Sequence, residues 1–194
     1  MNGQSNGTDR TEARTPPSAT TPPPLPAPTS RNINVGPADP CTSLTDKAIQ
    51  AVIDQIKASL ARAMSDDAAH GPAASTPGAY PSAARDNVTY LTEARDKMET
   101  LLAWLYSVGA LGSPPGTPPT YVSNISAAYS IHGYVRETVI SLHYARHWAI
   151  ISASYHQSAD ARDSYEFTTE ALALLEPLGA QAGQCYMEAY GPFS

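Results

Sequence analysis

The sequence predicts an all-α protein, an antiparallel four-helix-type bundle with a short C-terminal helix and a disordered N-terminal arm rich in proline and threonine. Apolar residues recur at helical spacing along four long stretches, and no stretch alternates in the manner of a β-strand. The composition also changes sharply near Cys41. We therefore divide the chain into an arm, residues 1–40, and a helical bundle domain, residues 41–194.

The arm holds half of the chain's 18 prolines and no aromatic residue, and its large aliphatic residues are Leu25, Ile33 and Val35. Such a segment buries too little apolar surface to offset the entropy lost on ordering, so we expect it to be disordered. Residues 22–28 favour polyproline II, which suits a spacer or a ligand for an aromatic groove. We favour the spacer.

The first helix is expected to begin at Ser43, because Ser43 and Asp46 resemble a capping box, and to end before the polar residues 65–67. The second is expected over residues 82–109. Its predicted core-facing positions follow a heptad seam, which consists of Ala84, Val88, Leu91, Arg95, Met98, Leu102 and Leu105.

The third helix, expected to start within residues 117–120, is poor in charge. Between residues 121 and 157 the only formal charges are those of Arg136, Glu137 and Arg146. A surface helix normally carries many charges on its solvated face, so we expect this helix to be central and the most buried. Its predicted seam consists of Ile125, Ala128, His132, Val135, Val139, Leu142, Arg146, Ala149 and Ala153.

The turn into the fourth helix is expected within residues 155–160, with Ser158 as the N-cap. Pro177 lacks a backbone N–H and is expected to kink or end this helix. A short final helix should follow, with an apolar stripe formed by Leu178, Ala182, Cys185 and Ala189.

Composition argues against several functional classes. The net charge of −6 and the pI near 5.2 disfavour nucleic acid as a partner. No apolar run approaches the ~20 residues needed to span a membrane, and no apolar signal opens the chain, so we expect a cytoplasmic protein. Cys41 and Cys185 are then expected to be reduced thiols, with a disulfide between the two ends as the alternative.

Common catalytic and cofactor motifs are absent, and no cofactor is predicted. His143 and His147 lie four residues apart, so both lie on one helical face and can bind one metal ion. Glu166 and Glu170, also four apart on the next helix, are the candidates to complete a set of metal ligands.

A second candidate site is an anion pocket formed by His143, Arg146 and His147. His132 lies close to three helical turns before His143 and therefore near the same face, so it is a fourth candidate ligand-binding residue. The simpler interpretation, which we favour, is that these side chains pack against and hydrogen-bond their neighbours, because buried polar groups are usually satisfied in this way.

The aromatic content points to protein interfaces. The chain contains eleven tyrosines and two phenylalanines. Tyrosine suits an interface because its ring can be buried while its hydroxyl group forms a hydrogen bond. The first hypothesis is a non-enzymatic helical interaction or assembly module with a flexible N-terminal tether, forming a homo-oligomer or binding a protein partner. The alternative is a small helical-bundle enzyme, or a ligand- or metal-binding protein, with its site at His143, Arg146 and His147.

Overall fold

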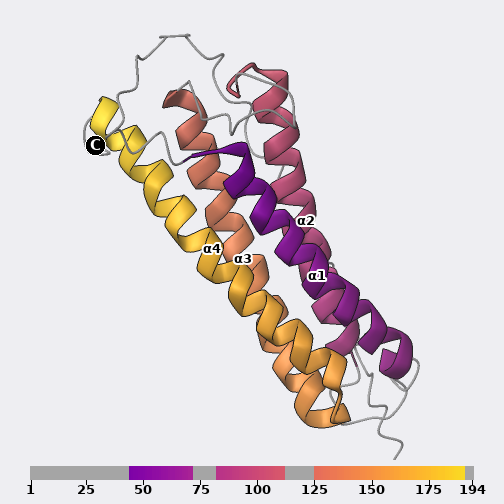
Figure 1. The fold of residues 1–194 in the computed structure, drawn as a ribbon. Coiled ribbons are helices and arrows are strands. Elements are labelled where there is room, and N and C mark those ends of the chain that lie inside the picture. Colours follow the sequence, from indigo (N-terminus) through magenta and orange to yellow (C-terminus); the bar gives the residue numbers. More distant parts are fainter. Residues whose placement is uncertain (1–43, 72–81, 112–124, 191–194) are drawn as a thin grey trace, which may run out of the picture.

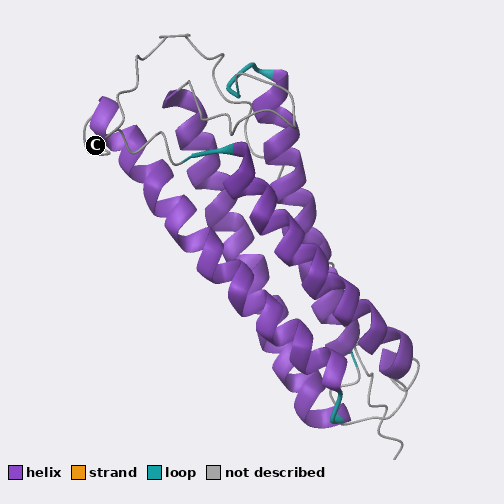
Figure 2. Ribbon diagram, viewed as in Figure 1, coloured by secondary structure: helices purple, strands orange, loops and turns teal. Residues whose placement is uncertain are grey.

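A computed structural model of the protein describes residues 44–71, 82–111 and 125–190. These residues form four helices, α1 (Asp46–His70), α2 (Ala83–Ser107), α3 (Ile125–His156) and α4 (Ala159–Tyr190) (Figure 1). No strand occurs among the described residues (Figure 2). The predicted all-α class is confirmed, whereas the arm, residues 1–40, lies outside the described residues.

The helices form an antiparallel arrangement in which each one packs on two others. α1 and α3 both pack against α2 and α4, and successive helices run in opposite directions (Figure 1). This arrangement encloses one core. Its largest fully buried side chains are those of Leu44, Ile49, Val52, Ile53, Ile56, Leu91, Met98, Leu101, Leu105, Ile131, Leu142 and Leu175.

α1 differs from the prediction at both ends. Thr45 is its N-cap, and the Thr45 hydroxyl accepts a hydrogen bond of 3.1 Å from the backbone N–H of Ala48. The predicted start, Ser43, lies outside the described residues. At its other end α1 continues through residues 65–67 to His70. Asp66 can lie on the buried side of this last part because the core provides hydrogen-bond donors for its carboxylate.

The expectation that the third helix is central was wrong, because α3, like each of the other helices, packs on two neighbours. α3 buries one side, where small residues such as Ala128, Ala145 and Ala149 allow close packing, and exposes the other, which includes His143 and Tyr144. A helix at the corner of a four-helix arrangement is covered only by its two neighbours. The exposed face of α3 is therefore the part of the helix that is poor in charge. Three positions of its predicted seam, His132, Val139 and Arg146, are only partly buried and lie at the flanks of the helix.

The turn between α3 and α4 was predicted correctly. Gln157 adopts a left-handed conformation, with φ of 52°, and the Ser158 hydroxyl accepts a hydrogen bond of 3.1 Å from the backbone N–H of Ala161. The separate C-terminal helix, however, does not exist, because α4 continues through Pro177 to Tyr190. Pro177 has no N–H to donate to the backbone carbonyl of Ala173, one turn earlier. Both residues are exposed, so water can donate to that carbonyl instead.

Cys185 also departs from the expectation of reduced thiols. It is buried on α4 and takes part in a disulfide bond. The only other cysteine of the chain is Cys41, which lies outside the described residues. In the described part of the chain, no helix combines the length and apolar character that crossing a membrane would require.

Candidate functional site

The predicted histidine face lies at the surface of the protein. His143 and His147 are exposed on α3, on the side that faces away from the core. Nη2 of Arg146 lies 3.4 Å from Nδ1 of His143, and the His147 ring meets the Trp148 ring edge-on at a centroid distance of 5.4 Å. Three of the four predicted ligand-binding residues are therefore neighbours, but they do not line an interior.

The predicted set of metal ligands is not assembled. Glu170 accepts a hydrogen bond from the side chain of Gln55 on α1, so its carboxylate lies toward α1. Glu166 is exposed on α4. Within the described ranges, no three His, Cys, Asp or Glu residues are placed to hold a metal ion, and His143, His147, Glu166 and Glu170 all fall within these ranges.

His132 faces α4. Its Nδ1 lies 3.2 Å from the carbonyl oxygen of Gly179, and the ring passes close to Gly183. The imidazole thus fits between α3 and α4 at a place where α4 has glycines. This is the packing role that the sequence suggested for the histidines, and His132 is the one residue of the predicted face that fills it.

A second group of polar residues was not recognised in the sequence. At the end of the bundle where α1 and α3 finish, Asp66, His70, Ser152 and His156 form what we call the imidazole cluster. The two oxygens of the buried Asp66 carboxylate accept separate hydrogen bonds, one of 2.6 Å from the Ser152 hydroxyl and one of 2.9 Å from Nδ1 of His70. The His70 and His156 rings stack at 4.5 Å, with 15° between their planes.

The hydrogen bonds of the imidazole cluster do not activate Ser152 as a nucleophile. In a nucleophilic triad the serine hydroxyl is hydrogen-bonded to histidine, which takes up its proton. Here the Ser152 hydroxyl donates to Asp66 instead, and so does His70. Both donors hold the carboxylate in place, which makes the group a polar connection between α1 and α3.

His156 is the electrostatically unusual member of the cluster. Burial, reinforced by the neighbouring His70 ring and opposed by Asp66, lowers the pKa of His156 below its ordinary value. Its Nε2 atom is buried and has no hydrogen-bond partner among the described residues. A protonated imidazole would carry a charge next to a second imidazole in a partly desolvated site, so the neutral form is favoured.

The sequence carried one local signal for this cluster. Asp66 and His70 are four residues apart and therefore share one face of a helix. Ser152 and His156 have the same spacing on α3. Nothing in either pattern indicates that the two pairs meet, because α1 and α3 are not consecutive in the chain.

The exposed side of α3 is the other feature that stands out. The outer face of α3 consists of ten exposed residues, Tyr129, Gly133, Arg136, Glu137, Ile140, His143, Tyr144, His147, Ile150 and Tyr155. Tyr129 packs beside Tyr186 of α4 at a ring distance of 5.3 Å, and Tyr144 stacks on Tyr90 of α2 at 5.1 Å. The two tyrosines therefore lean toward opposite neighbours and remain about half exposed.

Comparisons with known proteins identify no relative. A scan against models of protein families finds no match, and searches of curated proteins and of solved structures find no significant match.

Proposed function

We propose that the protein is a non-enzymatic helical assembly module that associates with further copies of itself through the outer face of α3. Five of the eight large apolar side chains classed as exposed among the described residues lie on α3, with exposed fractions of 44–52%. They are Tyr129, Ile140, Tyr144, Ile150 and Tyr155. This concentration on one helix is the observation that carries the proposal.

Exposed apolar side chains gathered on one face usually mark a surface that is covered in the functional state. The charge distribution supports the same conclusion. α1, α2 and α4 alternate exposed acids and bases, for example Lys57 and Glu99, which form an ion pair of 2.7 Å. On α3 the charges are few, and tyrosine, which is enriched at interfaces, takes much of the exposed surface.

The alternative, a ligand-binding site at His143, Arg146 and His147, required these side chains to face a low-charge interior. His143 and His147 are exposed on the outer face of α3, and Arg146 lies at its flank. These positions remove that premise and make the two histidines part of the proposed contact surface. The arm, residues 1–40, is assigned the role of a tether on its proline-rich composition alone.

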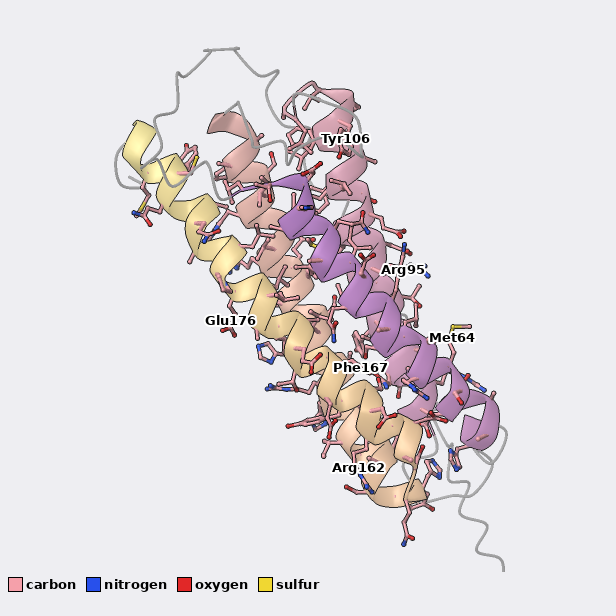
Figure 3. All side chains as sticks on the ribbon, viewed as in Figure 1. Met64, Arg95, Tyr106, Arg162, Phe167 and Glu176 are labelled. Atoms are coloured by element: carbon pink, nitrogen blue, oxygen red, sulfur yellow. The ribbon has the colours of Figure 1, made fainter. Side chains whose placement is uncertain are left out.

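Light scattering coupled to size-exclusion chromatography over a range of protein concentrations tests this proposal. We expect the wild type to self-associate and the Ile140→Asp variant to remain monomeric, because a carboxylate buried without a partner opposes association. Met64→Asp is the matched control. Met64 is an equally large apolar residue on α1 and is 57% exposed (Figure 3), so this change should leave association unaltered. A wild type that is monomeric at high concentration would refute the proposal.

A further inference from the structure

We infer that the proline-rich segment of the arm, residues 22–28, docks within its own chain on two tyrosines, Tyr129 of α3 and Tyr186 of α4, which we call the aromatic pair. Residues 29–40 then remain the spacer that joins this segment to the bundle. The docking goes beyond the proposed function and does not depend on self-association, because it takes place within a single chain. It covers one end of the outer face of α3 and leaves the part around Ile140 for the proposed contact between copies.

The segment has the composition of a polyproline II ligand. Residues 22–28 have the sequence PPPLPAP, in which Pro23 and Pro26 form a P-x-x-P pattern. Polyproline II has three residues per turn, so in that conformation these two prolines share one face. Proline-rich segments bind aromatic surfaces well because their conformation is already restricted and little entropy is lost on binding.

The aromatic pair presents tyrosine rings at the junction of two helices. The rings of Tyr129 and Tyr186 lie 5.3 Å apart and are inclined by 46°. Tyr129 is 45% exposed, and Met187, the next residue of α4, is an exposed apolar side chain as well. Proline-rich segments dock on surfaces built from aromatic rings, and tyrosine offers a large, rigid ring for such a contact.

The arm joins the bundle beside the aromatic pair. Cys185, the residue before Tyr186, takes part in a disulfide bond, and Cys41 is the only other cysteine of the chain. The end of the arm is therefore held at α4, next to the pair. The start of α1, the start of α3 and the end of α4 all lie at this end of the bundle (Figure 1).

The length of the spacer suits the contact. Thirteen peptide units separate Pro28 from Cys41, and a flexible segment of this length spans about 20 Å on average. A ligand attached in this way is present at an effective concentration on the order of 1 mM. At that concentration a contact with a dissociation constant of about 0.1 mM is about nine-tenths occupied. A weak contact is therefore sufficient.

A second pair of stacked tyrosines, Tyr90 and Tyr144, lies farther from the arm. Its rings are 5.1 Å apart. Tyr144 follows Tyr129 by 15 residues along α3, which corresponds to about 22 Å, and it leans toward α2 rather than α4. The arm reaches this pair only with a more extended spacer, so Tyr144 provides a control for position.

Photo-cross-linking of the full chain tests the docking. The variant Met187→p-benzoylphenylalanine should cross-link to the arm within one chain. Trypsin cleaves after Arg14 and Arg31 and releases residues 15–31 as one peptide, in which mass spectrometry locates the link. Met64→p-benzoylphenylalanine is the matched control, because Met64 is exposed toward the other end of the bundle, and it should not label this peptide.

Further substitutions separate docking from mere proximity. If Tyr129→Ala weakens the contact about thirtyfold, as the loss of a strong interface residue does, occupancy falls from about nine-tenths to about one quarter. The yield of the cross-link from position 187 should then fall about three- to fourfold. Pro23→Ala combined with Pro26→Ala should also lower it, whereas Tyr144→Ala should leave it unchanged.

Two results would overturn the docking. One is a yield that neither Tyr129→Ala nor the double proline variant lowers, which would show that the arm is only close to position 187. The other is a link found only between two chains, as a dimer on a denaturing gel. Because the expected link lies within one chain, its presence or absence is independent of whether the protein self-associates. Circular dichroism of every variant confirms that the helices are retained.

Discussion

At the scale of single residues, the imidazole cluster shows how one buried carboxylate is accommodated. Asp66 lies on the core side of α1 and would be costly there without donors. Ser152 and His70 supply one hydrogen bond to each oxygen. Its neighbour Asp67 lies at the edge and has a long contact of 3.8 Å with Arg85. Two adjacent aspartates thus have different roles, which depend on the helix face that each occupies.

The same cluster makes the stability of the fold depend on pH. The pKa of His156 is lower in the folded protein than its ordinary value near 6.5, so the unfolded chain binds a proton more readily than the folded one. The contribution of His156 to stability is therefore complete above that ordinary value and is lost as the pH falls toward the lowered pKa. The charged or titratable groups around it are His70 and Asp66 from α1 and Tyr155 from α3.

We accordingly expect the free energy of unfolding, measured with urea, to decrease between about pH 7 and pH 5. In His156→Gln this decrease should be smaller, because the glutamine amide does not titrate. His147→Gln is the matched control, since His147 is exposed on the same helix, and it should keep the wild-type dependence. An unchanged pH profile in His156→Gln would show that another group is responsible.

At the scale of elements, the contact between α3 and α4 depends on glycine. Gly179 is buried on α4, and a Cβ atom there would lie 2.8 Å from Cγ1 of Val135 on α3. Valine is branched at Cβ and has little freedom to move aside, so the two helices would have to separate. At Gly183 the nearest atom is Nδ1 of His132 at 3.4 Å, which is a tolerable contact.

This difference predicts opposite effects for the same substitution. Gly183→Ala should stabilise the protein by up to about 1 kcal/mol, because alanine is the better helix former. Gly179→Ala should destabilise it by about 1–3 kcal/mol, because the overpacking outweighs the same gain. Urea unfolding of both variants measures the two values. Equal effects at the two positions would contradict the close approach of α3 and α4 at Gly179.

At the scale of the whole molecule, the disulfide at Cys185 changes the expectation drawn from the sequence. A disulfide is typical of proteins that fold in an oxidising compartment, so it weighs against the cytoplasmic location expected from composition. Cys185 lies near the C-terminal end of α4, and the only other cysteine, Cys41, precedes α1. A bond between them closes a loop that contains nearly the whole bundle.

Such a bond should stabilise the fold by restricting the unfolded chain. We expect reduction to lower the free energy of unfolding by about 2–4 kcal/mol, and Cys185→Ser to show the same loss with no further change on adding reductant. Peptide mapping without reductant should recover a fragment that links Cys41 to Cys185. Two thiols that react freely in the folded, unreduced protein would rule the bond out.

The sequence by itself determined the helical class, the Ser158 cap and most of the core-facing positions. These features depend on interactions within a few residues along the chain, such as a hydroxyl that caps the next turn or apolar residues that recur at helical spacing. The sequence also indicated that α3 is unusual, because the low charge of this segment can be read directly from its residues.

Only the tertiary structure decided what that low charge means. Composition cannot distinguish a helix covered on all sides from one at a corner whose uncharged face is exposed, because the difference lies in how many neighbours the helix has. The tertiary structure also separated Glu170 from His143 and brought Asp66 to Ser152. Both results depend on which faces of distant segments meet, and spacing within one helix carries no information about that.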